Sequence, residues 1–246
     1  MKLNYPEIEK QEDKPVTIDF RDDSRFYSVP NIISDEIKEA ASKCIAVQRS
    51  MVSDGNLTHR STEIAKSAVS KESLYEILES GADIHGISAN SEISDVVVFN
   101  SSHIDKSIND SLLTEVRDHL DAKMAVLLRD EISKSRKFRV ACSGHFWYPP
   151  GSYMGWHTNN KAAGWRAYLT YATQPGRSFF RYRDPRNGEI VTSLDGEWDL
   201  RIFRVDPRAS LWHAVYSETD RFSFGYAIVE KGLISSLVSR AKSIIS

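Results

Sequence analysis

The residues from Phe138 to Val229 form a succession of short segments rich in β-branched and aromatic side chains, and this succession constrains the fold more than any other feature. Within these segments the residue pattern has a period of two, which is typical of β-strands. Turn sequences such as Pro-Gly, Pro-Arg-Asn-Gly and Asp-Gly separate them. The segments are FRVACSGHFWY, RAYLTYAT, SFFRYR, GEIVTS, WDLRIFRV, SLWHAVYS and RFSFGYAIV. At least seven strands within about ninety residues predict an antiparallel sandwich or barrel.

The first half of the chain has helical periodicity instead. Ser34 is a predicted N-cap, because Asp35 and Glu36 follow it and acidic side chains are favourable in the first turn of a helix. The apolar residues that recur at helical spacing after this cap are Ile37, Ala40, Ala41 and Cys44. A further helix is predicted in VSKESLYEILESG, with its end at Gly81.

The longest helix is predicted from residue 105 to residue 130, in DKSINDSLLTEVRDHLDAKMAVLLRD. The residues expected on its apolar stripe are Ile108, Leu112, Leu113, Val116, Leu120 and Met124. The preceding segment SDVVVFN is typical of an isolated strand, and LISSLVSRAKSIIS at the end of the sequence is typical of a closing helix.

These elements predict the α+β class, with helices gathered against one side of a β-rich core. We expect a single domain over residues 1–246. Within it, residues 1–133 form a mainly helical support, residues 134–231 form the β-rich core, and residues 232–246 form a C-terminal helix.

Composition narrows the cellular setting. The sequence of 246 residues is 41% hydrophobic and 27% charged, which is ordinary for a soluble globular protein. No apolar run is long enough to cross a membrane, and the first residues lack the apolar region of a secretory signal. The only two cysteines, Cys44 and Cys142, are too few for a disulfide framework or a zinc cluster. We therefore expect a protein of the reducing cytoplasm.

The charge is unevenly distributed along the chain. Residues 1–133 hold 15 basic and 25 acidic side chains, whereas residues 134–231 hold 15 basic and 9 acidic ones. The arginines of the second half either form a basic mouth for an acidic substrate or cosubstrate, or pair with the acidic N-terminal layer. No motif for nucleic-acid binding accompanies them.

The stretch YPPGSYMGWHTNN contains the most informative polar pair, His157 and Asn159. Residues i and i+2 of a strand share a face, so both side chains can point into one cavity while Trp156 and Thr158 turn away. A histidine followed at i+2 by a carboxylate is a common way to hold iron, but here the second residue is an amide. The pair is a metal site with an altered ligand, a metal site that has been lost, or an ordinary strand with a polar end.

Two later segments add polar groups to strand faces that are otherwise apolar. His213 in SLWHAVYS shares a face with apolar neighbours. Arg221 and Ser223 share one face of the last strand, whose other face is aromatic. An arginine in this position requires a carboxylate, which its guanidinium can bind in bidentate fashion while the Ser223 hydroxyl adds a hydrogen bond.

With these residues identified, the segment from 138 to 230 resembles the double-stranded β-helix, a jelly-roll or cupin-like fold, of the Fe(II)- and 2-oxoglutarate-dependent dioxygenases. The family pattern is His-x-Asp/Glu, a distal histidine about fifty residues later, and Arg-x-Ser about eight to ten residues beyond. The matching residues are HTN at 157–159, WHAV with His213, and RFS at 221–223. The stretch YPPGSYMGWH also resembles the Tyr-x-x-Gly sequence before the first ligand in the prolyl-hydroxylase-like branch.

The resemblance implies that His157, Asn159 and His213 hold Fe(II), which neutral imidazoles and a hard oxygen suit. It also implies that 2-oxoglutarate chelates the metal and places its far carboxylate on Arg221 and Ser223. With O2, oxidative decarboxylation would give succinate and CO2 and hydroxylate an unactivated C–H bond. Further candidates to bind 2-oxoglutarate are Tyr148, Tyr153 and Tyr168. Aromatic residues in strands more often belong to the core.

Other functions remain open on the sequence. A catalytically silent relative would bind a partner or small molecule in the same barrel, and a wider cupin-type barrel would perform non-oxidative metal chemistry. Halogenation is disfavoured, because halogenases of this family place a small residue where Asn159 stands. His145 either supports a metal ligand or is structural. The substrate class stays open between a peptide and a small molecule, including modified nucleobases.

Overall fold

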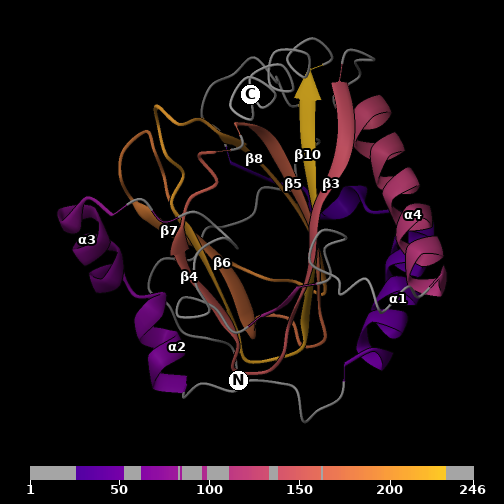
Figure 1. Cartoon of the computed structure of the whole chain (residues 1–246), viewed down its shortest axis with the longest axis horizontal. Helices are drawn as coiled ribbons and strands as arrows, with labels where there is room; N and C mark the ends of the chain where they lie inside the picture. The colour runs from indigo at the N-terminus through magenta and orange to yellow at the C-terminus, as the bar shows by residue number, and fades with distance from the viewer. Residues whose placement is uncertain are drawn as a thin grey trace, which may run out of the picture.

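Two antiparallel β-sheets face each other at the centre of the molecule, which we describe from a computed structural model (Figure 1). The structure describes residues 26–52, 62–82, 84, 96–98, 111–132, 138–161 and 163–230. The larger sheet has the order β1-β8-β5-β10-β3-β2, and the smaller sheet has the order β4-β9-β6-β7. The strands are β1 (Tyr27–Ser28), β2 (Val97–Val98), β3 (Phe138–Tyr148), β4 (Tyr153–His157), β5 (Gly164–Ala172), β6 (Ser178–Arg183), β7 (Ile190–Leu194), β8 (Trp198–Val205), β9 (His213–Ser217) and β10 (Arg221–Glu230).

From β3 to β10 the chain crosses between the sheets at every step except the hairpin from β6 to β7. As a result β10, the last strand, lies between β3 and β5, and β9 lies between β4 and β6. Eight strands in this interlaced order form a double-sheet jelly roll, that is, a double-stranded β-helix. The predicted α+β class and β-helix core are therefore confirmed.

The helices cover the outer faces of the two sheets (Figure 1). Helices α1 (Asp35–Ser50) and α4 (Ser111–Val126) pack on the larger sheet, and a π-helical turn (Leu127–Ile132) continues α4. Helices α2 (Thr62–Ala68) and α3 (Lys71–Ser80) pack beside the smaller sheet, and a short 3-10 turn (Pro30–Ile32) precedes α1. None of the helices in the described ranges combines the length and the hydropathy needed to cross a membrane.

The helix boundaries follow the predicted capping residues. Ser34 Oγ accepts a hydrogen bond from the Ile37 amide at 3.4 Å, so it caps the N-terminus of α1 as expected. At the end of α3, Gly81 has φ +67° and its amide donates to the Leu78 carbonyl. A side chain at this position would be strained, which explains the glycine.

Two predictions about the first half are wrong in detail. Leu112 was expected on the buried stripe of α4 but is 51% exposed, because the buried face is centred on Leu113, Leu120 and Met124 and includes Arg117. The strand in SDVVVFN is not isolated, since β2 pairs antiparallel with β3. The predicted residue Ile108 and the C-terminal helix 232–246 lie outside the described residues.

Five arginines of the β-rich half pair with carboxylates of that same half. The pairs are Arg177–Glu218, Arg186–Asp184, Arg201–Asp195, Arg208–Asp206 and Arg221–Asp195. The expectation that these arginines pair with the acidic N-terminal layer is therefore wrong for these five. Closely spaced Arg and Asp residues meet across turns and neighbouring strands, where they are already adjacent in space.

Candidate active site

A cavity of about 160 Å³ lies between the two sheets, on the inner faces of both. Its lining comprises Ser143, Phe146, Tyr148, Met154, His157, Asn159, Arg166, Tyr168, Phe180, His213, Val215, Arg221 and Ser223. The structure thus brings together every site residue predicted from the sequence except Tyr153. No Asp or Glu is among these lining residues.

The two predicted metal-binding histidines face each other across the smaller sheet. Strands β4 and β9 are paired so that His157 and His213 are direct cross-strand partners. Their ring centroids are 4.1 Å apart, and both side chains are buried. The pairing of β4 with β9 therefore unites two residues that are 56 positions apart in the sequence.

Backbone carbonyls orient both imidazole rings in the same way. His157 Nδ1 lies 2.8 Å from the Gly155 carbonyl oxygen, and His213 Nδ1 lies 3.0 Å from the Leu211 carbonyl oxygen. Because a carbonyl can only accept, each Nδ1 carries the hydrogen and each Nε2 keeps its lone pair. Metal-binding histidines are commonly oriented by this kind of contact.

Both rings are electrically neutral. Burial lowers the pKa of His157 from 6.5 to about 4. Burial, together with the neighbouring His157, also places the pKa of His213 well below its usual value. The two Nε2 lone pairs are therefore available to a metal at neutral pH without the release of a proton.

Asn159 lies two residues after His157, the last residue of β4, and contacts His213. Its Nδ2 is 3.3 Å from His213 Nε2 and 3.5 Å from the Tyr168 hydroxyl. In this rotamer the amide N–H caps the lone pair of His213. Turning the amide over would exchange its two end atoms and present Oδ1, a hard oxygen, to the same position.

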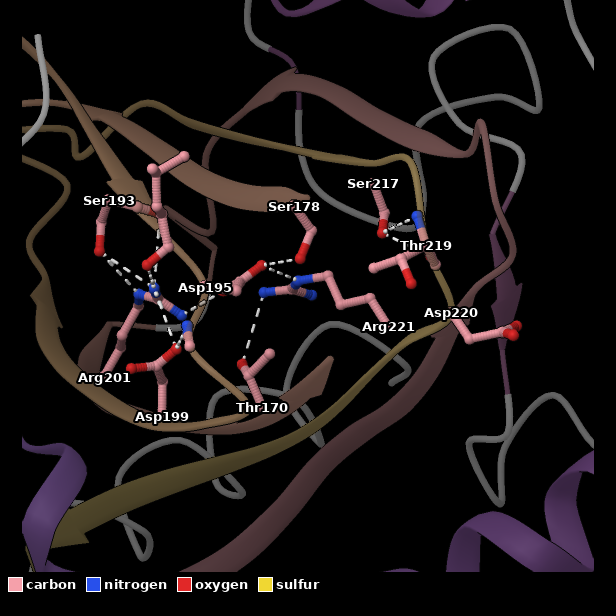
Figure 2. Close-up of polar contacts among 12 residues, drawn as sticks. Thr170, Ser178, Ser193, Asp195, Asp199, Arg201, Ser217, Thr219, Asp220 and Arg221 are labelled. Atoms are coloured by element: carbon pink, nitrogen blue, oxygen red, sulfur yellow. Dashed lines mark hydrogen bonds and ion pairs between the residues drawn. The ribbon is translucent and has the colours of Figure 1, made fainter. Parts of the chain in front are cut away.

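At another part of the cavity wall, Arg221 is already paired with a protein carboxylate (Figure 2). Arg221 Nε donates to Asp195 Oδ2 at 2.8 Å, and Arg221 Nη2 lies 3.4 Å from Thr170 Oγ1. Asp220, the neighbour of Arg221 in the sequence, is not this carboxylate, and Figure 2 shows its side chain pointing away from Arg221.

Asp195 is the centre of a buried hydrogen-bond network that contains Arg201 and Ser178 in addition to Arg221 (Figure 2). Arg201 Nη1 donates to Asp195 Oδ1 at 2.6 Å, and Ser178 Oγ donates to Oδ2 at 2.5 Å. Asp199 adds a second carboxylate, 3.6 Å from Arg201 Nη2. Burial alone would raise the pKa of Asp195, but Arg221, Arg201 and the hydrogen bonds outweigh it and lower the pKa below its usual range.

The remaining edge of the Arg221 guanidinium is not satisfied within the described protein. Arg221 Nη1 is buried and has no hydrogen-bond partner there, although the side chain lines the cavity. The guanidinium carbon lies 4.9 Å from the centroid of the Tyr148 ring, which supports it from one side. Ser223 shares the cavity wall and is also buried. A buried donor of this kind indicates a place for an acceptor.

Tyr153 does not line the cavity, so the prediction that it contacts 2-oxoglutarate is wrong. The register of β4 against β9 shifts between Met154 and His157. This irregularity breaks the alternation of side chains, so Met154 and His157 both line the cavity. Tyr153 is fully buried in the cluster that includes Ala65 of α2 and Phe179.

Two charged residues of the site were missed from the sequence. Asp195 stands in an Asp-Gly sequence that was interpreted only as a turn. Arg166 is on β5, two and four residues before Tyr168 and Thr170, so strand alternation alone would have placed it on the cavity face. Arg166 is buried, and its Nη1 donates to the Trp165 carbonyl at 3.1 Å.

No protein-family model matches the chain, and no curated protein matches it significantly. Similar solved structures include a Pseudomonas putida prolyl-4-hydroxylase, with 12% identity, a TM-score of 0.48 and coverage of 83% of this chain and 92% of that one. A Trichoplax adhaerens prolyl hydroxylase, in complex with a hypoxia inducible factor peptide fragment, has 11% identity, a TM-score of 0.42 and coverage of 84% of both chains. A viral collagen prolyl hydroxylase from Paramecium Bursaria Chlorella virus-1, in a 2OG complex, has 13% identity, a TM-score of 0.38 and coverage of 82% and 96%.

Scores and identities this low add little to the geometry of the chain itself. The strand order is the firmer observation, because each strand from β3 to β10 occupies its place in the two interlaced sheets. By that order the chain has the double-stranded β-helix fold, the fold of the Fe(II)- and 2-oxoglutarate-dependent dioxygenases that its His157, His213 and Arg221 spacing resembles.

Proposed function

We propose that this protein is an Fe(II)- and 2-oxoglutarate-dependent oxygenase that hydroxylates an unactivated C–H bond, with release of succinate and CO2. One observation carries the proposal. One cavity is lined by two buried, neutral histidines with Nε2 lone pairs and by a buried arginine with an unsatisfied Nη1. The histidines suit a divalent metal and the arginine suits a carboxylate, and 2-oxoglutarate joins these two requirements in one molecule.

The residues present fit the metal. His157 and His213 would contribute Nε2, and Asn159 would contribute Oδ1 after its amide turns away from the His213 lone pair. This ligand set is neutral. The positive charge of Fe(II), which the usual Asp or Glu ligand partly balances, would here be balanced by a carboxylate of the cosubstrate. When bound, Fe(II) would supply the activation of O2 and the oxidative decarboxylation of 2-oxoglutarate.

The cavity wall also fits the far carboxylate of 2-oxoglutarate. Arg221 Nη1 is the free donor, and the hydroxyls of Ser223 and Tyr168 line the same cavity. Asp195 holds Arg221 through Nε, so it fixes the direction in which the fork points. Because Asp195 and Asp199 already balance Arg221 and Arg201, binding would depend more on directed hydrogen bonds than on net charge.

A specific observation also supports a second function, a catalytically silent binding protein with the same fold. Asn159 replaces the expected carboxylate and caps the His213 lone pair, while Arg221 already has Asp195 as its counter-ion. Two groups that an oxygenase needs are thus partly engaged within the protein. Such a cavity would bind a small molecule or a peptide segment without turnover.

The decisive experiment is an anaerobic titration of the purified protein with Fe(II) and 2-oxoglutarate, followed by exposure to air. We expect a weak visible charge-transfer band that requires both additions, and succinate release with candidate peptide, amino-acid and nucleobase substrates. His157→Ala should lose the band, whereas His119→Ala, an exposed substitution on α4, should keep it. Absence of the band from the unmodified protein would exclude the oxygenase, and a band without succinate release across these pools would favour the silent protein.

A further inference from the structure

A second group of metal-ligating side chains lies on the outer face of the larger sheet, away from the cavity. It occupies the layer between that sheet and helices α1 and α4, and we call it the outer cluster. Its members are Cys44 and Gln48 of α1, Arg117 and Asp121 of α4, Cys142 and His145 of β3, and Tyr226 of β10. The proposed oxygenase chemistry uses none of these residues, and His145, which the sequence left open as a support for a metal ligand, does not line the cavity.

A β-bulge in β3 creates the cluster. Opposite β10, Gly225 pairs with Gly144 and Tyr226 pairs with Cys142, so Ser143 is the extra residue. In a regular strand, residues three apart point to opposite faces. Here the bulge sends Ser143 into the cavity and leaves Cys142 and His145 together on the outer face, where both approach Asp121.

Unsatisfied polar atoms are concentrated in this layer. Nine buried side-chain nitrogen or oxygen atoms lack a hydrogen-bond partner in the described part of the chain. Five of them belong to the outer cluster: Gln48 Oε1, Arg117 Nε, Asp121 Oδ1, His145 Nε2 and Tyr226 Oη. His145 is completely buried, and its Nε2 lies 3.4 Å from Asp121 Oδ1 without hydrogen-bond geometry. Buried polar atoms without a partner indicate a binding site between them, for either an ion or buried water.

We propose that the outer cluster binds a zinc ion through Asp121 Oδ1, Cys142 Sγ and His145 Nε2. These three atoms lie within 4.8 Å of one another, and the ligand atoms of a tetrahedral zinc site are separated by about 3.5 Å. A thiolate with an imidazole and a carboxylate is a donor set that suits zinc rather than magnesium or calcium. The ion would satisfy two of the five orphaned atoms directly and would tie α4 to the sheet behind the cavity.

The neighbours of these ligands fit the same occupant. Gln48 Nε2 is 3.3 Å from His145 Nδ1. If the Gln48 amide is turned over, its Oε1 accepts a hydrogen bond from His145 Nδ1–H, and His145 Nε2 is left for the metal. The fourth position of the tetrahedral site would hold water. The Cys142 thiolate and the Asp121 carboxylate together balance the two charges of the zinc ion. Composition alone predicted too few cysteines for a zinc cluster, but here one cysteine is sufficient because Asp121 and His145 supply the other protein ligands.

The test is a cobalt titration of the chelator-treated, reduced protein, with Co²⁺ as the spectroscopic probe for zinc. We expect an intense near-ultraviolet band from thiolate-to-cobalt charge transfer and its displacement by Zn²⁺. The candidate active site contains no cysteine, so only the outer cluster can produce this band. It should therefore persist in the His157→Ala/His213→Ala double variant, which makes the test independent of the proposed oxygenase.

Variants then assign the ligands. Cys142→Ser should abolish the band, and His145→Ala should weaken zinc binding by at least about tenfold, since even indirect partners of a metal contribute that much. His119→Ala, on the exposed side of α4, should leave both unchanged. The proposal is overturned if the unmodified protein shows no thiolate band at saturating cobalt, which would indicate a cluster filled by water. A band that survives in folded Cys142→Ser would also overturn it.

Discussion

Arg221 Nε and Asp195 Oδ2 are 2.8 Å apart, and both side chains are almost completely buried between the sheets. This pair joins the start of the last strand, β10, to the turn between β7 and β8. It means that the arginine proposed to bind 2-oxoglutarate has a permanent counter-ion, so its role in binding and its role in stability must be separated by experiment.

We expect Arg221→Met to have two effects. The 2-oxoglutarate concentration needed for half-maximal turnover should rise by at least about tenfold, because a charge-assisted contact is lost. The free energy of unfolding should also fall, by about 3 kcal/mol, because Asp195 loses one of its two buried arginine partners. Turnover assays and denaturant titrations measure these effects separately.

The double variant Arg221→Met/Asp195→Asn distinguishes the two roles. Neutralising Asp195 removes the uncompensated charge and should restore part of the lost stability. It should not restore the affinity for 2-oxoglutarate, because the guanidinium is still absent. Recovery of cosubstrate affinity in the double variant would mean that Arg221 acts only as a structural partner of Asp195.

Asn159 should control the affinity for iron. Asn159→Asp adds a negative charge next to His213 Nε2, so anaerobic titration should show tighter Fe(II) binding with turnover kept or increased. Asn159→Ala should bind iron more weakly, and in the unmodified protein 2-oxoglutarate should tighten iron binding markedly. Equal affinities in all three proteins would show that this side chain does not touch the metal.

The buried histidines should make the metal-free protein sensitive to acid. Burial lowers the pKa of His157 from 6.5 to about 4, so between these values the unfolded chain takes up a proton that the folded chain does not. The stability that results is fully present above pH 6.5 and is lost as the pH falls toward 4, by up to about 3 kcal/mol. Denaturant titrations across this range should show a shallower pH dependence for His157→Gln.

Tyr168, which lines the cavity, and Tyr153, which does not, should respond differently to loss of the hydroxyl group. Tyr168→Phe removes a hydroxyl that lines the cavity beside Asn159 and should raise the 2-oxoglutarate requirement by about fivefold, the equivalent of one hydrogen bond. Tyr153→Phe changes a residue that packs with Ala65 of α2 and Phe179, away from the cavity, and should leave that requirement unchanged. The reverse order of effects in steady-state assays would contradict the orientation of β4.

Much of the fold follows from local pattern. Period-two segments mark the strands, Ser34 and Gly81 mark helix ends, and the spacing of His157, His213 and Arg221 places three side chains in one cavity. These features are readable because each depends on neighbours in sequence or on a recurring motif.

Features set by tertiary contacts could not be predicted in this way. Asp195 reaches Arg221 across 26 residues, and nothing in its Asp-Gly sequence distinguishes a buried counter-ion from an exposed turn. The irregularity in β4 lies where the register of its pairing with β9 shifts, so strand alternation counted back from His157 would place Tyr153 on the wrong face. Leu112 is exposed because the position of α4 against the sheet, and not helical periodicity, decides which side of a broad apolar stripe is covered.

The interlaced strand order also governs when the molecule can become active. One of the two central strands of the larger sheet is β10, the last strand within the described residues, and it carries Arg221. Until it has been inserted between β3 and β5, those strands have no partner on that side, and the cavity lacks one wall. Such non-local pairings form slowly. A nascent or truncated chain that ends before β10 can therefore contain both histidines and still have no closed cavity, so cosubstrate binding should report the completion of the whole barrel.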